Sequence, residues 1–128
     1  MSDRKLVPER ALLVRVLAEL LEYLGHTVAT CLEEEEHRPP TLGGCKPDVY
    51  AMKRGSPSII GTVELSATLH DDSTQQRWKS LVAAATRPGS HPGDELHIIV
   101  PTCCLDEAEQ QATDWGVIAT FHTSKLAD

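Results

Sequence analysis

Aromatic residues are scarce in this chain and make up 4% of it. A core built from this sequence must therefore consist mainly of leucine, valine, isoleucine and alanine. The scarcity also removes the series of aromatic side chains on which the bases of a single-stranded nucleic acid stack. The formal net charge of -7 argues further against a general polyanion binder, although a local patch can differ from the sum.

Long apolar runs are lacking as well. No stretch reaches the roughly 18 to 20 apolar residues that cross a bilayer, and residues 1–5 are not followed by the apolar run of a signal peptide. We therefore expect a cytoplasmic protein that does not enter the membrane. The 128 residues suit a single domain with one core, spanning 1–128.

The four cysteines lack the Cys-x-x-Cys spacing of a zinc knuckle. With six histidines in the chain, a mixed cysteine and histidine metal site could still be assembled in space. Free thiols in a reducing compartment are the favoured interpretation. The acidic run Glu33 to Glu36 is interpreted as a solvated loop or strand end.

Apolar residues recur at helical spacing from Pro8 to Leu24, and this predicts the first helix. Pro8 suits the first helical position and Gly25 the position just past the end. The remaining elements are predicted from shorter patterns. They are strands over 26–32, 46–52 and 58–66, a helix over 73–86, a strand over 95–100, a helix over 106–115 and a strand over 117–121. This order is typical of an α/β protein.

Two acids lie in the paired strands between Lys46 and Ser66. Because side chains alternate along a strand, Asp48 shares a face with Tyr50, and Glu64 shares a face with Ser66. A hairpin would bring Asp48 and Glu64 together. Neighbouring carboxylates repel and are costly to bury, so a hard divalent cation, Mg²⁺ or Mn²⁺, is the predicted partner.

The element order and several short motifs resemble the PD-(D/E)xK nuclease superfamily, which has the restriction-endonuclease-like fold. The archaeal-type Holliday junction resolvases are nearest in motif pattern. The resemblance covers roughly residues 4–100 and implies a three-layer α/β/α fold with a mixed central sheet. The matching motifs are Arg4-Lys5, Glu9-Arg10, Pro47-Asp48 followed by apolar residues and Lys53, and Glu64-Leu65-Ser66.

The resemblance also implies a reaction and site residues. Asp48 and Glu64 would bind the Mg²⁺ or Mn²⁺ ion, with the Leu65 carbonyl and Glu9 in support. The ion would promote attack of water on a DNA phosphodiester bond. Cutting two strands implies a homodimer. For Glu9 the alternative is a first-turn carboxylate that only interacts with the helix dipole.

One residue departs from the family pattern. Ser66 stands where the family has the lysine that activates the attacking water, and a hydroxyl cannot supply positive charge. Lys79 is the best candidate to replace that lysine, with Gln75 one turn before it on the same helix. The alternative for Lys79 is a solvated helix lysine.

Three functions stay open at this point. The chain is an active Mg²⁺-dependent endonuclease, a catalytically inactive nuclease-fold module for binding or regulation, or a small α/β domain that binds a protein. Ser66 and the net charge favour the second, whereas the retained acids favour the first.

Overall fold

The computed structural model of the chain describes residues 7–32, 38–86 and 94–125. The acidic run Glu33 to Glu36, the turn-rich linker over 87–93 and the motif pair Arg4-Lys5 lie outside the described residues.

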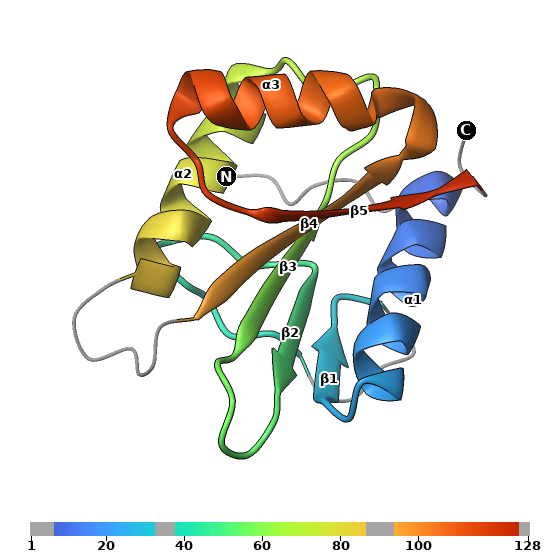
Figure 1. Ribbon diagram of the computed structural model, residues 1–128, viewed down its shortest axis with the longest axis vertical. Helices are drawn as coiled ribbons and strands as arrows, with labels where there is room; N and C mark the ends of the chain where they lie inside the picture. Colours follow the sequence, from blue (N-terminus) through green and yellow to red (C-terminus); the bar gives the residue numbers. More distant parts are fainter. Residues whose placement is uncertain (1–6, 33–37, 87–93, 126–128) are drawn as a thin grey trace.

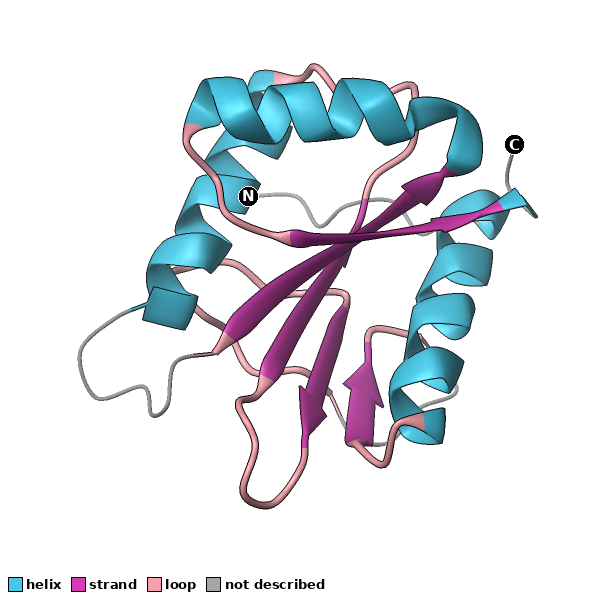
Figure 2. Cartoon of the chain, in the orientation of Figure 1, coloured by secondary structure: helices cyan, strands magenta, loops and turns pink. Residues whose placement is uncertain are grey.

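The predicted order of helices and strands is confirmed (Figures 1 and 2). Gly116 ends the last helix in the left-handed conformation, with φ of 69°, and Val117 N still bonds the helix at Ala112 O. The final strand therefore starts three residues later than the sequence predicts. The elements are α1 Pro8–Tyr23, β1 Thr27–Thr30, β2 Val49–Met52, β3 Ile59–Val63, α2 Asp72–Thr86, β4 Glu95–Pro101, the 3₁₀ turn η1 Thr102–Cys104, α3 Leu105–Trp115 and β5 Thr120–Ser124.

The five strands form one mixed sheet in the order β1-β2-β3-β4-β5. The pairs β1·β2 and β2·β3 are antiparallel, whereas the pairs β3·β4 and β4·β5 are parallel. Parallel neighbours require a crossover, and α2 and α3 supply it for β4 and β5. The protein is therefore an α/β domain with helices flanking a five-stranded mixed sheet. Within the described ranges, no helix has both the length and the apolar character that a membrane crossing demands.

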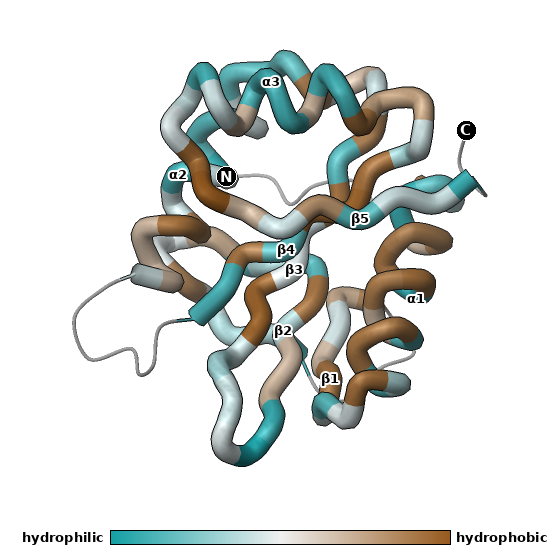
Figure 3. Tube along the Cα trace, in the orientation of Figure 1, coloured by the Kyte–Doolittle hydropathy of each residue, from teal (hydrophilic) through white to brown (hydrophobic). Residues whose placement is uncertain are grey.

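Each face of the sheet carries a hydrophobic cluster. Leucines and valines of α1 pack on one face, against Val49, Val63 and Ile99. Side chains of α2 and α3 pack on the other face. Trp78 is fully buried there, and its ring centre lies 5.3 Å from that of Trp115 in an edge-to-face arrangement. In Figure 3, where the trace is coloured by hydropathy, apolar brown segments recur along α1.

Gly61 of β3 allows α1 to approach the sheet closely. A Cβ atom at this position would lie 2.9 Å from both Leu17 Cδ2 and Val49 Cβ. Such distances are shorter than van der Waals contact, so only glycine fits without a shift of the Leu17 side chain and of Val49 on β2.

Candidate functional site

Asp48 and Glu64 lie on the same face of the sheet, the one that α2 covers. Asp48 directly precedes β2 and Glu64 directly follows β3. The register pairs Val49 with Gly61, so Asp48 stands opposite Thr62 and Glu64 lies two residues further along. The two acids are therefore diagonal neighbours, at a spacing that leaves room for other groups between them.

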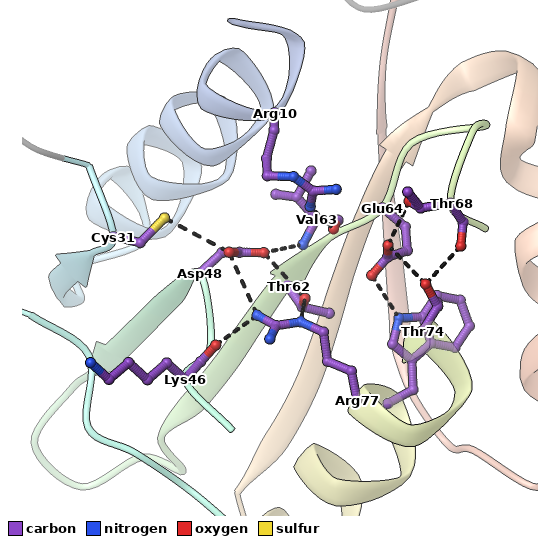
Figure 4. A network of polar contacts seen from close by, with 11 residues as sticks. Arg10, Cys31, Lys46, Asp48, Thr62, Val63, Glu64, Thr68, Thr74 and Arg77 are labelled. Atoms are coloured by element: carbon purple, nitrogen blue, oxygen red, sulfur yellow. Dashed lines mark hydrogen bonds and ion pairs between the residues drawn. The ribbon is translucent and has the colours of Figure 1, made fainter. Parts of the chain in front are cut away.

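Protein donors surround the Asp48 carboxylate, which belongs to a residue only 5% exposed (Figure 4). Its Oδ2 accepts hydrogen bonds from Val63 N at 2.8 Å and Thr62 Oγ1 at 3.2 Å. Its Oδ1 lies 3.7 Å from the Cys31 thiol donor and 3.5 Å from Arg77 Nη2. A carboxylate offers about four acceptor positions, and three of these contacts are hydrogen bonds while the fourth is an ion pair.

Among the described residues, Arg77 of α2 forms an ion pair with this acid. Its Nε donates to Thr62 Oγ1 at 2.9 Å, and its Nη2 donates to the Lys46 carbonyl at 2.7 Å. The guanidinium thus ties α2 to the strand pair while it offsets the charge of Asp48. Sequence reasoning missed Arg77. The sequence could have indicated Arg77 by its position next to Trp78, because this places it at the edge of the buried stripe of α2.

Glu64 is 1% exposed and has its own set of donors. Its Oε1 accepts from Thr68 Oγ1 at 3.0 Å and Thr74 Oγ1 at 3.3 Å, and its Oε2 accepts from Trp78 Nε1 at 3.3 Å. Buried charges are tolerated where hydrogen bonds replace the lost water. The loop after β3 and the start of α2 supply those bonds here.

Arg10 brings a second buried guanidinium to the strand ends. Arg10 is 4% exposed, and its Nη1 donates to the Val63 carbonyl. The backbone amide of Val63 in turn donates to Asp48 (Figure 4). The Nε of Arg10 has no hydrogen-bond partner among the described residues. Val63 therefore connects Arg10 to the polar group around Asp48.

The other predicted site residues take no part in these hydrogen bonds. Glu9, Ser66 and Lys79 are exposed, and no hydrogen bond or ion pair between described residues joins them to Asp48 or Glu64. Lys79 and Gln75 line a shallow depression of about 620 Å³ on α2, away from its buried stripe.

The arrangement does not fit a hard divalent ion as it stands. The Leu65 carbonyl, a predicted ligand, accepts the Thr68 amide at 3.1 Å and closes a turn. In the described part of the chain, no three His, Cys, Asp or Glu side chains are grouped to hold a metal. Mg²⁺ needs carboxylate oxygens at near-ideal octahedral positions. An ion bound by both acids would therefore have to displace the protein donors that now engage those oxygens.

Comparison of the chain with models of protein families, with curated proteins and with solved structures finds no match. The arrangement of the residues themselves is therefore what bears on function.

Proposed function

We propose that this chain is a nuclease-like domain that binds DNA without cutting it. In this proposal two neighbouring sets of polar contacts, Asp48 and Thr62 with Arg77 and Glu64 with Thr74 and Trp78, are together called the clamp and fasten α2 to the sheet. The resemblance to the PD-(D/E)xK superfamily supplies the nuclease-like fold and the expected ligand. The contacts around the two acids supply the argument against cleavage.

One observation carries the proposal, namely that protein donors already engage both carboxylates. The acids were expected to need a divalent cation because they repel each other. Arg77 lies 3.5 Å from Asp48, and Thr68, Thr74 and Trp78 donate to Glu64. The repulsion is therefore offset without an ion, and the retained acids no longer argue for catalysis.

Lys46 is the cation best placed for a phosphate contact near the clamp. Its carbonyl binds Arg77, and the residue itself is exposed. A lysine that neutralises a phosphate releases counterions, so it contributes to the salt dependence of binding. Lys46→Ala is expected to lower the affinity for DNA and to reduce the slope of log affinity against log salt concentration by about one unit. Arg54→Ala, in the exposed turn between β2 and β3, removes the same charge far from the clamp and serves as the control.

The decisive experiment offers duplex, branched and single-stranded DNA to the protein with Mg²⁺ or Mn²⁺. We expect a gel shift without cleavage for the wild type and for Ser66→Lys, and no rise in melting temperature with Mg²⁺. Cleavage that disappears in Asp48→Ala would show a working nuclease and overturn the proposal. Cleavage gained in Ser66→Lys would do the same, because the acids would then hold the ion. Failure to bind any of the three DNA forms would remove DNA as the ligand.

A further inference from the structure

A second polar group lies on β4 and β5, on the opposite face of the sheet from the clamp. Residues Glu95, His97 and Ile99 alternate along β4, and Ile99 belongs to the cluster that packs on α1. The register pairs Ile99 with His122, so His122 shares this face. His97 is 8% exposed, whereas His122 is half-buried on the edge strand.

The two imidazoles meet through ring nitrogens. His97 Nδ1 and His122 Nε2 are 2.8 Å apart, the ring centres are 5.0 Å apart, and the ring planes differ by 26°. The distance from the centre of each ring to its nitrogen, taken twice and added to the distance between the two nitrogens, is close to the distance between the ring centres. The two nitrogens therefore lie near the line that joins the centres. The rings therefore meet end to end, with the nitrogen lone-pair positions directed into the space between them.

Glu95 orients the first ring. Its Oε1 lies 3.0 Å from His97 Nε2, so that nitrogen carries the hydrogen in the neutral ring, and Nδ1 presents a lone pair. With no metal bound, His122 Nε2 donates its hydrogen to that lone pair. If the hydrogen of His122 moves to its Nδ1, both facing nitrogens offer lone pairs at once. A histidine that donates its other ring hydrogen to a carboxylate is the usual arrangement around metal ligands.

We propose that His97 Nδ1 and His122 Nε2 form a binding site for a borderline divalent metal of the Zn²⁺ class, with Glu95 as the residue that orients His97. Tetrahedral zinc with bonds of 2.0–2.1 Å separates two nitrogen ligands by about 3.4 Å and needs their lone pairs to converge at about 109°. The rings therefore need to part by about half an ångström and to turn from their end-to-end arrangement toward the metal. An edge strand with a half-buried histidine permits that movement. Within the described ranges no third His, Cys, Asp or Glu completes the set, so water fills the remaining positions.

This inference does not depend on the proposed DNA binding, since it concerns other residues on the other face. The competing explanation is that the nitrogen-to-nitrogen hydrogen bond only fastens β5 to β4. In that case the pair has no affinity for metal beyond that of a solvated histidine.

The experiment titrates Zn²⁺ into the full chain by calorimetry and follows the melting temperature, with Cu²⁺ as a spectroscopic probe. We expect one Zn²⁺ per chain, a rise in melting temperature, and Cu²⁺ nitrogen hyperfine structure from two imidazoles. His122→Ala is expected to weaken binding at least about tenfold and to leave one nitrogen in the Cu²⁺ spectrum, and Glu95→Gln to weaken it about tenfold. Circular dichroism without metal confirms that each variant is folded.

His70→Ala is the matched control. His70 also lies beside a carboxylate, Glu107 at 2.8 Å, but Gln111 occupies its other nitrogen in place of an imidazole. It should leave the affinity unchanged. Equal affinity in the wild type and His122→Ala would overturn the proposal, as would the absence of any melting shift at millimolar Zn²⁺. Loss of binding in Cys103→Ser, whose thiol lies 3.8 Å from that of Cys104, would instead assign the metal to the thiols and overturn it too.

Discussion

Arg77 on α2 reaches across to Asp48 at the start of β2, with 3.5 Å between guanidinium nitrogen and carboxylate oxygen. This ion pair puts a protein cation where the sequence predicts a divalent metal. Both side chains are largely removed from solvent, at 11% and 8% exposed, so their mutual attraction is weakly screened. The link also joins the second helix to the strand pair that carries both acids.

Asp48→Ala should destabilise the protein by about 3 kcal/mol, because it leaves Arg77 and three further donors without their acceptor. Urea unfolding in the presence of EDTA measures the change. A site built for a metal behaves in the opposite way, since removing one of two repelling acids stabilises the metal-free protein. Asp106→Ala, at an exposed position in the first turn of α3, is the control and should change stability by less than about 1 kcal/mol.

Glu64→Gln should cost about 2 kcal/mol, although it preserves the shape of the side chain. An amide has one acceptor oxygen and no charge, so Trp78 Nε1 loses a charged acceptor, and the two threonine hydroxyls must turn their hydrogens to the Leu65 and Thr68 carbonyls. Near-ultraviolet circular dichroism should also change, because Trp78 loses its acceptor or its orientation. Glu109→Gln, at an exposed position, is the control and tests whether the removal of any one negative charge destabilises the protein by the same amount. A shift of equal size there would contradict the assigned role of Glu64.

Gly61→Ala should destabilise the fold by about 1 to 3 kcal/mol through overpacking. The new methyl group would lie 2.9 Å from Leu17 Cδ2, which can rotate, and 2.9 Å from Val49 Cβ, which cannot move without its strand. The unfolding midpoint in urea reports the effect. An unchanged midpoint would show that α1 sits further from the sheet than described.

Stability should fall as the pH drops below about 6.5. Burial, and to a lesser extent the neighbouring His97, lower the pKa of His122 from its usual 6.5. The unfolded chain then binds a proton in a pH range where the folded protein does not, so the free energy of unfolding decreases as pH falls through that range. Urea unfolding with EDTA between pH 5 and 7.5 should show this component in the wild type and lose it in His122→Gln. The exposed His70→Gln should keep it.

Much of the fold follows from local sequence patterns. The apolar stripe of α1, the Pro8 start and the alternation of side chains between the two faces along β2 and β3 each depend on residues close in the chain, and the structure bears them out. The start of β5 was missed because the apolar residues at 117–119 resemble a strand, whereas the left-handed Gly116 first returns the chain towards the sheet.

The candidate site was predictable only in part. Strand alternation places Asp48 and Glu64 on one face, and that expectation agrees with the register. The sequence predicted Lys79 as the nearby cation, yet Arg77 occupies that place, because a difference of two residues turns a side chain by about 200° around the helix, to nearly the opposite side.

The sequence by itself determined the order of the elements and the facing acids, since both follow from the periods of helices and strands. Only the tertiary structure decided what offsets those acids, because Arg77 and Asp48 are 29 residues apart in the chain. The packing of α2 determines which of the side chains on that helix reach the sheet. The same holds for His97 and His122. They meet through the parallel register of β4 and β5, and that register depends on how the crossover helix packs.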